Sequence, residues 1–180
     1  QLEPRHVDAL RALTDLRRLG GDAQERLQAA RNAAEVLPSH PLILLDLAQA
    51  LLAAKKPQEA LTYAQAAAAA CPSLSRAHAV LAEVRLALND KAAAATSAGE
   101  ALQRNDRDPS AWVADGRVKA AGGDFKGAAE AFTKALELDD YLAQAHWELG
   151  KELAKQNRTR DAGVQRERAL ELEPRVYAGR

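Results

Sequence analysis

The fold is decided by the stretch AWVADG at residues 111–116 together with GDFKGAA at residues 123–129. These letters predict an apolar helix, a Gly-Asp turn and a second helix with small residues on one face. Thirty-four residues further along, AHWELG at 145–150 repeats the first helix, and ALELEP at 169–174 closes the second. A fixed period of this size is typical of a stacked array of two-helix units.

The period divides most of the chain into five units without an insertion between them. They begin at Val7, Pro41, Ser75, Pro109 and Ala143, so that each start lies 34 residues after the last. We therefore predict one domain over residues 7–176, made of units 7–40, 41–74, 75–108, 109–142 and 143–176. Residues 1–6 are expected to be a lead-in, and residues 177–180 a truncated tail. Each unit holds a first helix of about 13 residues, a short turn and a second helix of similar length, as in other helical arrays.

Small residues recur at three places in the units. They are Thr14, Ala48, Ala82, Gly116 and Gly150 at the eighth place, Ala60, Ala94, Ala128 and Ala162 at the twentieth, and Ala33, Ala67, Ala101, Ala135 and Ala169 at the twenty-seventh. Small side chains let two helices approach closely while larger apolar residues fill the remaining space. The columns therefore predict the helix crossings.

These columns resemble the tetratricopeptide repeat family. The resemblance covers residues 7–176 and implies an all-α fold, a right-handed superhelical solenoid of antiparallel helix pairs whose first helices line a concave groove. The first unit departs from the family pattern at Arg17 and Arg26, and the third departs at His78 and Arg85, where apolar residues are usual.

Composition narrows the function classes. Lys plus Arg and Asp plus Glu are 25 each, so the net charge is zero, whereas nucleic-acid binders usually carry a basic surplus. No apolar run approaches the roughly 20 residues that span a bilayer. We therefore expect neither nucleic-acid binding nor membrane insertion. Heavy use of Ala, Leu and Arg favours a bacterial source, with cytoplasm and periplasm both open.

Residues that could carry chemistry are few. The single cysteine, Cys71, excludes an internal disulfide and a cysteine-based zinc site. His78 and His146 occupy the same place two units apart, too far to share one metal ion, and we expect them to pack between paired helices. No catalytic triad, nucleophile elbow or phosphate-binding glycine loop is present. We predict no catalysis, no cofactor and no metal.

The resemblance also implies which places of each unit face the groove. Carried over, the predicted partner-binding residues are Arg11, Leu45, Asp46, Gln49, Arg76, Val80, Glu83, Val113, Arg117, Trp147, Glu148 and Lys151, with Asp8, Asp15, Arg18, Leu42, Gln144 and Lys155 also lining it. Leu45, Val80, Val113 and Trp147 are expected to form an apolar stripe. An exposed tryptophan beside cations, as expected for Trp147, is a usual interface anchor.

Two known uses of such a groove fit poorly. A clamp for a C-terminal carboxylate would place Arg11, Asp15, Asp46, Arg76 and Val80 around the ligand, and its two acidic members would repel that ligand. A ladder of asparagines would need Asn at the sixth place, where Asp46, Val80 and Glu148 are among the residues found.

Three functional hypotheses remain. The first is a protein–protein interaction scaffold that binds a protein or peptide segment in the groove. The second is an accessory domain of a larger bacterial enzyme or export machine, such as a glycosyl- or sulfotransferase or a polysaccharide-secretion protein, because the chain lacks Met and ends without a capping helix. The third is a homo-oligomer formed through an uncapped last unit.

Overall fold

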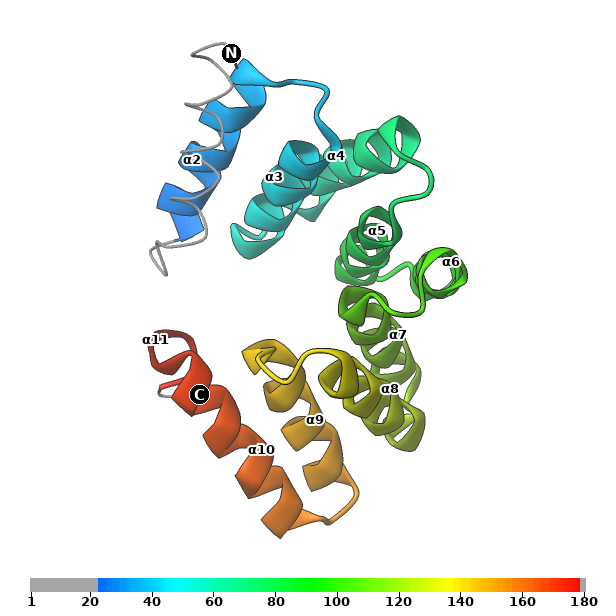
Figure 1. Ribbon diagram of the computed structural model, residues 1–180, viewed down its shortest axis with the longest axis vertical. Coiled ribbons are helices and arrows are strands. Elements are labelled where there is room, and N and C mark those ends of the chain that lie inside the picture. Colours follow the sequence, from blue (N-terminus) through cyan, green and yellow to red (C-terminus); the bar gives the residue numbers. More distant parts are fainter. Residues whose placement is uncertain (1–22, 179–180) are drawn as a thin grey trace.

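A computed structural model describes residues 23–178, and within that range it contains helices and no strand (Figure 1). The helices are α2 (Ala23–Val36), α3 (Pro41–Ala53), α4 (Pro57–Ala70), α5 (Ser75–Ala87), α6 (Lys91–Arg104), α7 (Pro109–Gly122), α8 (Phe125–Leu138), α9 (Ala143–Lys155), α10 (Thr159–Leu172) and α11 (Pro174–Tyr177). The pairs α3/α4, α5/α6, α7/α8 and α9/α10 fall in the predicted units. The predicted first helix of the first unit, with Arg11, lies outside the described residues.

The helix pairs follow one another along a curved array (Figure 1). Each pair packs internally and against the next, and α5 contacts α7 directly as well as α6. The first helices α3, α5, α7 and α9 lie on the inside of the curve, and the second helices α4, α6, α8 and α10 lie on the outside. The predicted all-α solenoid of antiparallel helix pairs is confirmed. None of the helices in residues 23–178 is long and apolar enough to cross a membrane.

The turn inside each described pair uses the same backbone conformation. Lys55, Asn89, Gly123 and Asn157 have φ values of 60°, 62°, 88° and 61°, and each lies 34 residues after the last. A single left-handed residue ends the first helix and redirects the chain, as at many helix C-termini. Asp90 and Asp124 then cap α6 and α8 by accepting bonds from Ala93 N (3.0 Å) and Gly127 N (2.8 Å).

The columns of small residues lie at the helix crossings, as predicted. The alanines at the twentieth and twenty-seventh places of the described pairs are all 0–2% exposed. At the eighth place, a Cβ built on Gly116 would lie 2.7 Å from Phe132 Cε1, and one built on Gly150 would lie 2.9 Å from Arg166 Cγ. Both distances are shorter than a normal contact, so glycine is required if these neighbours keep their positions.

Three rings at the fourth place of their units, those of His78, Trp112 and His146, join successive pairs. The buried His78 ring places Nε2 3.1 Å from Pro72 O, and His146 Nε2 lies 3.0 Å from Asp140 O. Trp112 Nε1, at the same place of its unit, donates to Asp106 O at 2.7 Å. Each ring thus reaches the carbonyl that ends the preceding pair, and a satisfied carbonyl explains why a histidine is accepted there. The expectation that these two histidines pack between helices is confirmed.

The C-terminal end of the array is partly covered by the chain itself. Tyr177 of α11 is 6% exposed and stacks on Trp147 with ring centroids 5.0 Å apart and an interplanar angle of 29°. Ala143, Ala169 and Leu172 complete this cluster. One turn of helix thus places an aromatic ring over Trp147, while Val164 and Leu170 of α10 remain 57% and 40% exposed, so α11 covers the last unit only in part.

Candidate binding groove

The predicted apolar stripe is not available on the inner surface. Leu45, Val80 and Val113 are 0%, 2% and 6% exposed, and Trp147 is half-buried against Tyr177. Neighbouring helices pack on these side chains: Leu45 and Val80 belong to one core cluster and Val113 to another. The prediction of an exposed apolar stripe with Trp147 as an exposed aromatic was wrong for this reason.

The polar residues of the predicted groove form two groups of contacts. The first group joins α3 to α5. Arg76 Nη2 lies 3.8 Å from Asp46 Oδ1 and donates to Gln49 Oε1 at 3.4 Å. These three side chains come from neighbouring units, so the contact runs across the array rather than along one helix.

The second group joins three successive first helices, α5, α7 and α9. Arg117 Nη1 donates to Glu83 Oε1 at 2.7 Å, and Arg117 Nη2 lies 3.7 Å from Glu148 Oε1. Lys151 Nζ donates to Glu148 Oε2 at 2.7 Å. Glu83, Arg117 and Lys151 occupy the ninth place of consecutive units. Glu148, from the sixth place of the last unit, lies between Arg117 and Lys151, so the four side chains form a row with alternating charge.

A pocket of about 380 Å³ lies beside this row, and we call it the groove pocket. It is lined by Glu83, Leu86, Arg117, Ala120, Ala121, Glu148, Lys151, Glu152 and Lys155. Glu152 is 1% exposed, and Lys155 Nζ binds both its oxygens at 2.9 and 3.0 Å while lying 4.4 Å from the centre of the Phe125 ring. Glu152 was not predicted as a groove residue. The only signal for it in the sequence is Lys155 three residues later, which can pair with a buried carboxylate on the same helix.

The structure thus divides the predicted site residues into four sets. Glu83, Arg117, Glu148 and Lys151 meet at the groove pocket, and Asp46, Gln49 and Arg76 form the separate group between α3 and α5. Leu45, Val80 and Val113 are core, and Trp147 belongs to the C-terminal cluster. Arg11 lies outside the described residues.

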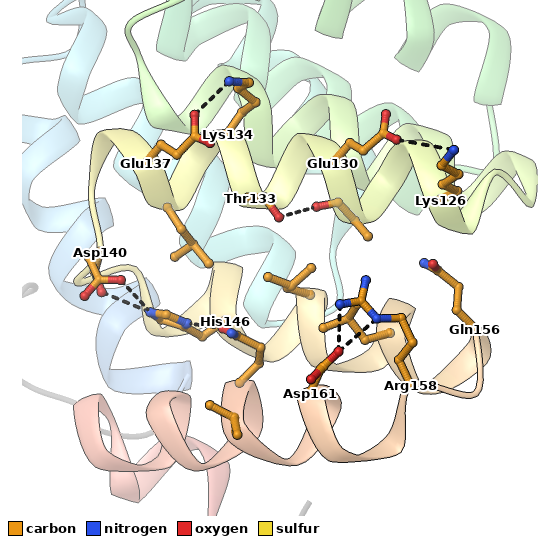
Figure 2. Close-up of a pocket in the computed structure, with 16 residues that line it drawn as sticks. Lys126, Glu130, Thr133, Lys134, Glu137, Asp140, His146, Gln156, Arg158 and Asp161 are labelled. Atoms are coloured by element: carbon orange, nitrogen blue, oxygen red, sulfur yellow. Dashed lines mark hydrogen bonds and ion pairs between the residues drawn. The ribbon is translucent and has the colours of Figure 1, made fainter.

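A larger cavity of about 790 Å³ lies on the outer side of the array and was not predicted (Figure 2). Its lining comes from α8, α9 and α10 and includes apolar Leu149 and Leu153 of α9. Figure 2 shows the charged residues of its rim paired along their own helices, as in Lys134–Glu137 on α8 (2.8 Å) and Arg158–Asp161 at the start of α10 (2.7 Å). The distance between α8 and α10 determines the size of this cavity. No local sequence pattern predicts that distance.

No group of three or more His, Cys, Asp and Glu side chains that could hold a metal ion occurs in the described part of the chain. The lining of the groove pocket combines charged hydrogen-bonding groups with the apolar side chains of Leu86, Ala120 and Ala121. Such a surface is suited to recognising a polar partner.

Comparison with protein families identifies the class. The Tetratricopeptide repeat model matches residues 7–75 and 79–143, which is well over half of the chain, and the chain belongs to the tetratricopeptide repeat family. Among curated proteins, no sequence matches it.

Solved structures show the same fold. The TPR protein TTC0263 of Thermus thermophilus is similar with a TM-score of 0.80 and 23% identity, over 95% of this chain and 92% of that one. MamA 41-end from Desulfovibrio magneticus RS-1 is similar with a TM-score of 0.58 and 20% identity, over 96% of each chain. YrrB, described as a TPR protein with an unusual peptide-binding site, has a TM-score of 0.54 and 20% identity over 92% of this chain and 82% of that one. Proteins of this family are generally non-catalytic scaffolds for protein–protein interaction.

Proposed function

We propose that this chain is a protein–protein interaction scaffold whose concave groove receives an extended or helical segment of a partner protein, without catalysis. One observation carries the proposal: the row Glu83–Arg117–Glu148–Lys151 links three first helices directly beside the groove pocket. The proposal treats residues 7–176 as one domain.

The row is suited to recognition because its charges are partly removed from water and already oriented. The Glu83, Arg117 and Glu148 side chains are 18%, 23% and 18% exposed. Two carboxylates hold the Arg117 guanidinium through different nitrogens, so little side-chain freedom remains to be lost when a partner binds. Charged groups arranged in this way contribute specificity and register more than raw affinity.

The groove pocket supplies shape as well as charge. Its volume is at the small end of the range of about 300–1,000 Å³ that is common for ligand pockets, so it fits one or two side chains of a longer segment rather than a whole cofactor. YrrB, a TPR protein with an unusual peptide-binding site, has the same fold, and this supports a peptide ligand for the groove.

The test is selection of peptides from a random display library on the immobilised protein, followed by affinity measurement against variants. We expect Arg117→Gln to weaken the selected peptides by about tenfold or more, because a central hydrogen-bonded charge is lost. Arg158→Gln is the matched control, since Arg158 is also paired with a carboxylate but lies on the outer side. Both variants should keep the helical signal in circular dichroism.

Equal affinity of the selected peptides for Arg117→Gln and for the parent chain would contradict the proposal. Loss of affinity in Arg158→Gln alone would place the binding surface at the outer cavity. Trp147 is a poor choice for this test, because its removal would uncover the C-terminal cluster and change stability.

A further inference from the structure

The ion pairs of the groove share an asymmetry between acid and base. Lys151 is 42% exposed against 18% for Glu148, and Lys155 is 41% exposed against 1% for Glu152. Arg76 is likewise 36% exposed against 16% for Asp46. In each of these pairs the base lies nearer the solvent and the carboxylate lies beneath it.

Arg117 follows the same order with a smaller difference. Its side chain is 23% exposed, against 18% for both Glu83 and Glu148. A molecule that enters the groove pocket therefore meets the ammonium groups of Lys151 and Lys155 first, and the Arg117 guanidinium and its two carboxylates lie deeper, at similar exposure.

The hydrogen-bonding groups of the pocket show the same order, with donors nearer the solvent than acceptors. An ammonium group carries three donors and no acceptor. Lys151 gives one of its donors to Glu148 at 2.7 Å, which leaves donors directed away from that carboxylate. The Glu152 carboxylate, in contrast, is turned inward and binds Lys155 through both oxygens. The accessible part of the pocket thus offers donors with positive charge.

The remaining lining fits an aliphatic stem. Leu86, Ala120 and Ala121 line the same pocket as Lys151 and Lys155 and supply its apolar side chains. A glutamate side chain has the matching form, with methylene groups behind a terminal carboxylate. A lysine side chain of similar form would bring its ammonium group against Lys151 and Lys155.

We propose that the groove pocket selects an acidic partner segment, whose side-chain carboxylates bind Lys151, Lys155 and Arg117 while its methylene groups contact Leu86 and the two alanines. This inference rests on the proposed groove function and names the chemistry of its ligand. The ligand groups are carboxylates within a segment, so a free C-terminus is not required. The four bases and four acids of the groove ion pairs balance in charge, so the attraction between the groove and an acidic partner acts at short range. Salt weakens this attraction at the exposed lysines.

The experiment measures fluorescence anisotropy of three labelled peptides of about 12 residues with blocked termini, a length typical of extended peptide ligands. The first peptide alternates Glu with Gly, Ser and Ala, the second replaces each Glu with Gln, and the third replaces each Glu with Lys. We expect the Glu peptide to bind about tenfold more tightly than the Gln peptide at low salt, and the Lys peptide to bind most weakly.

Lys151→Gln is the decisive variant, because Glu148 keeps Arg117 as a partner when Lys151 is lost. It should reduce the preference for Glu over Gln to about threefold or less, and Lys151→Arg should restore it. Lys134→Gln on α8 is the matched control, since Lys134 also binds a glutamate three residues away at 2.8 Å but lies at the outer cavity. Lys155 is avoided because its loss would leave the buried Glu152 without its cation.

Equal binding of the Glu and Gln peptides, tighter binding of the Lys peptide, no binding of any of them, or a preference unchanged in Lys151→Gln would each overturn this inference. If peptides selected by display still depend on Arg117 in that case, the groove function stands and only the acidic preference is wrong. If the selected peptides ignore Arg117, the groove function itself is wrong.

Discussion

The pairs α3/α4 and α5/α6 differ from α7/α8 and α9/α10 in how they fill the same crossing. In the first two pairs, alanines stand at both the eighth and the twenty-fourth places, and Ala48 with Ala64 and Ala82 with Ala98 are 0–1% exposed. In the last two pairs the eighth place is glycine. The twenty-fourth is Phe132 in one pair and Arg166 in the other, each close enough to exclude a Cβ.

The difference shows that the combined volume of the side chains at the eighth and twenty-fourth places determines how the two helices of a pair cross. Two alanines, or one glycine with one large side chain, give helix pairs with the same turn conformation. Protein interiors are packed to near-crystalline density, so one place determines what the other accepts. Neither residue can be judged alone.

The largest expected effect is from Phe132→Ala. Phe132 is fully buried, and its loss opposite Gly116 would leave a cavity that no neighbouring Cβ fills. We expect a loss of about 3–5 kcal/mol in the free energy of unfolding, measured by urea denaturation. A loss below about 1 kcal/mol would mean that α7 and α8 move together and fill the cavity without a second substitution.

The double change Gly116→Ala with Phe132→Ala sharpens the same comparison, because it copies the Ala82 and Ala98 arrangement. Alone, Gly116→Ala should cost about 1–3 kcal/mol through contact with the Phe132 ring. In the Phe132→Ala background it should stabilise by about 1 kcal/mol, because alanine favours the helix more than glycine. Additive effects in the four-member cycle would contradict the shared-volume explanation.

The next effect concerns the joints between pairs. His146→Phe keeps a ring of similar shape but removes both ring nitrogens, which lie 3.0 Å from Asp140 O and 2.6 Å from Gln165 Oε1. We expect a loss of about 1–2 kcal/mol in the free energy of unfolding, seen in thermal melts, because a part-buried carbonyl loses its donor. His40→Phe is the control, since His40 is exposed and its side chain makes no cap bond to α3. Equal melting shifts for the two variants would mean that the ring nitrogens have no role.

The smallest effect concerns the turns. Lys55 takes the left-handed conformation that Gly123 takes in the third described pair, with φ values of 60° and 88°. Lys55→Gly should stabilise by about 0.5–1 kcal/mol, because glycine has no Cβ to strain this conformation. Gly123→Ala should destabilise by about 1 kcal/mol for the opposite reason. The measurement is the change in melting temperature of each variant. Changes in the same direction would contradict the explanation from the left-handed backbone conformation.

The polar and the apolar residues predicted for the groove differ in exposure: Glu83, Arg117, Glu148 and Lys151 are partly exposed, whereas Leu45, Val80 and Val113 are buried. The family register placed Glu83, Arg117 and Lys151 on one face, and the structure joins them through Glu148. Leu45 and Val113 follow the same register but are buried. Register gives the direction of a side chain, but only the spacing of neighbouring helices decides whether water reaches it.

The amino-acid sequence by itself determined the repeat, the all-α class and the helix crossings, because a period of 34 residues and columns of alanine and glycine record local geometry directly. The tertiary structure alone decided that carboxylates lie beneath lysines in the groove pocket, that Tyr177 covers Trp147, and that the outer cavity opens between α8 and α10. These features depend on distances between helices that touch across separate units, and such distances follow from the packing of the whole array.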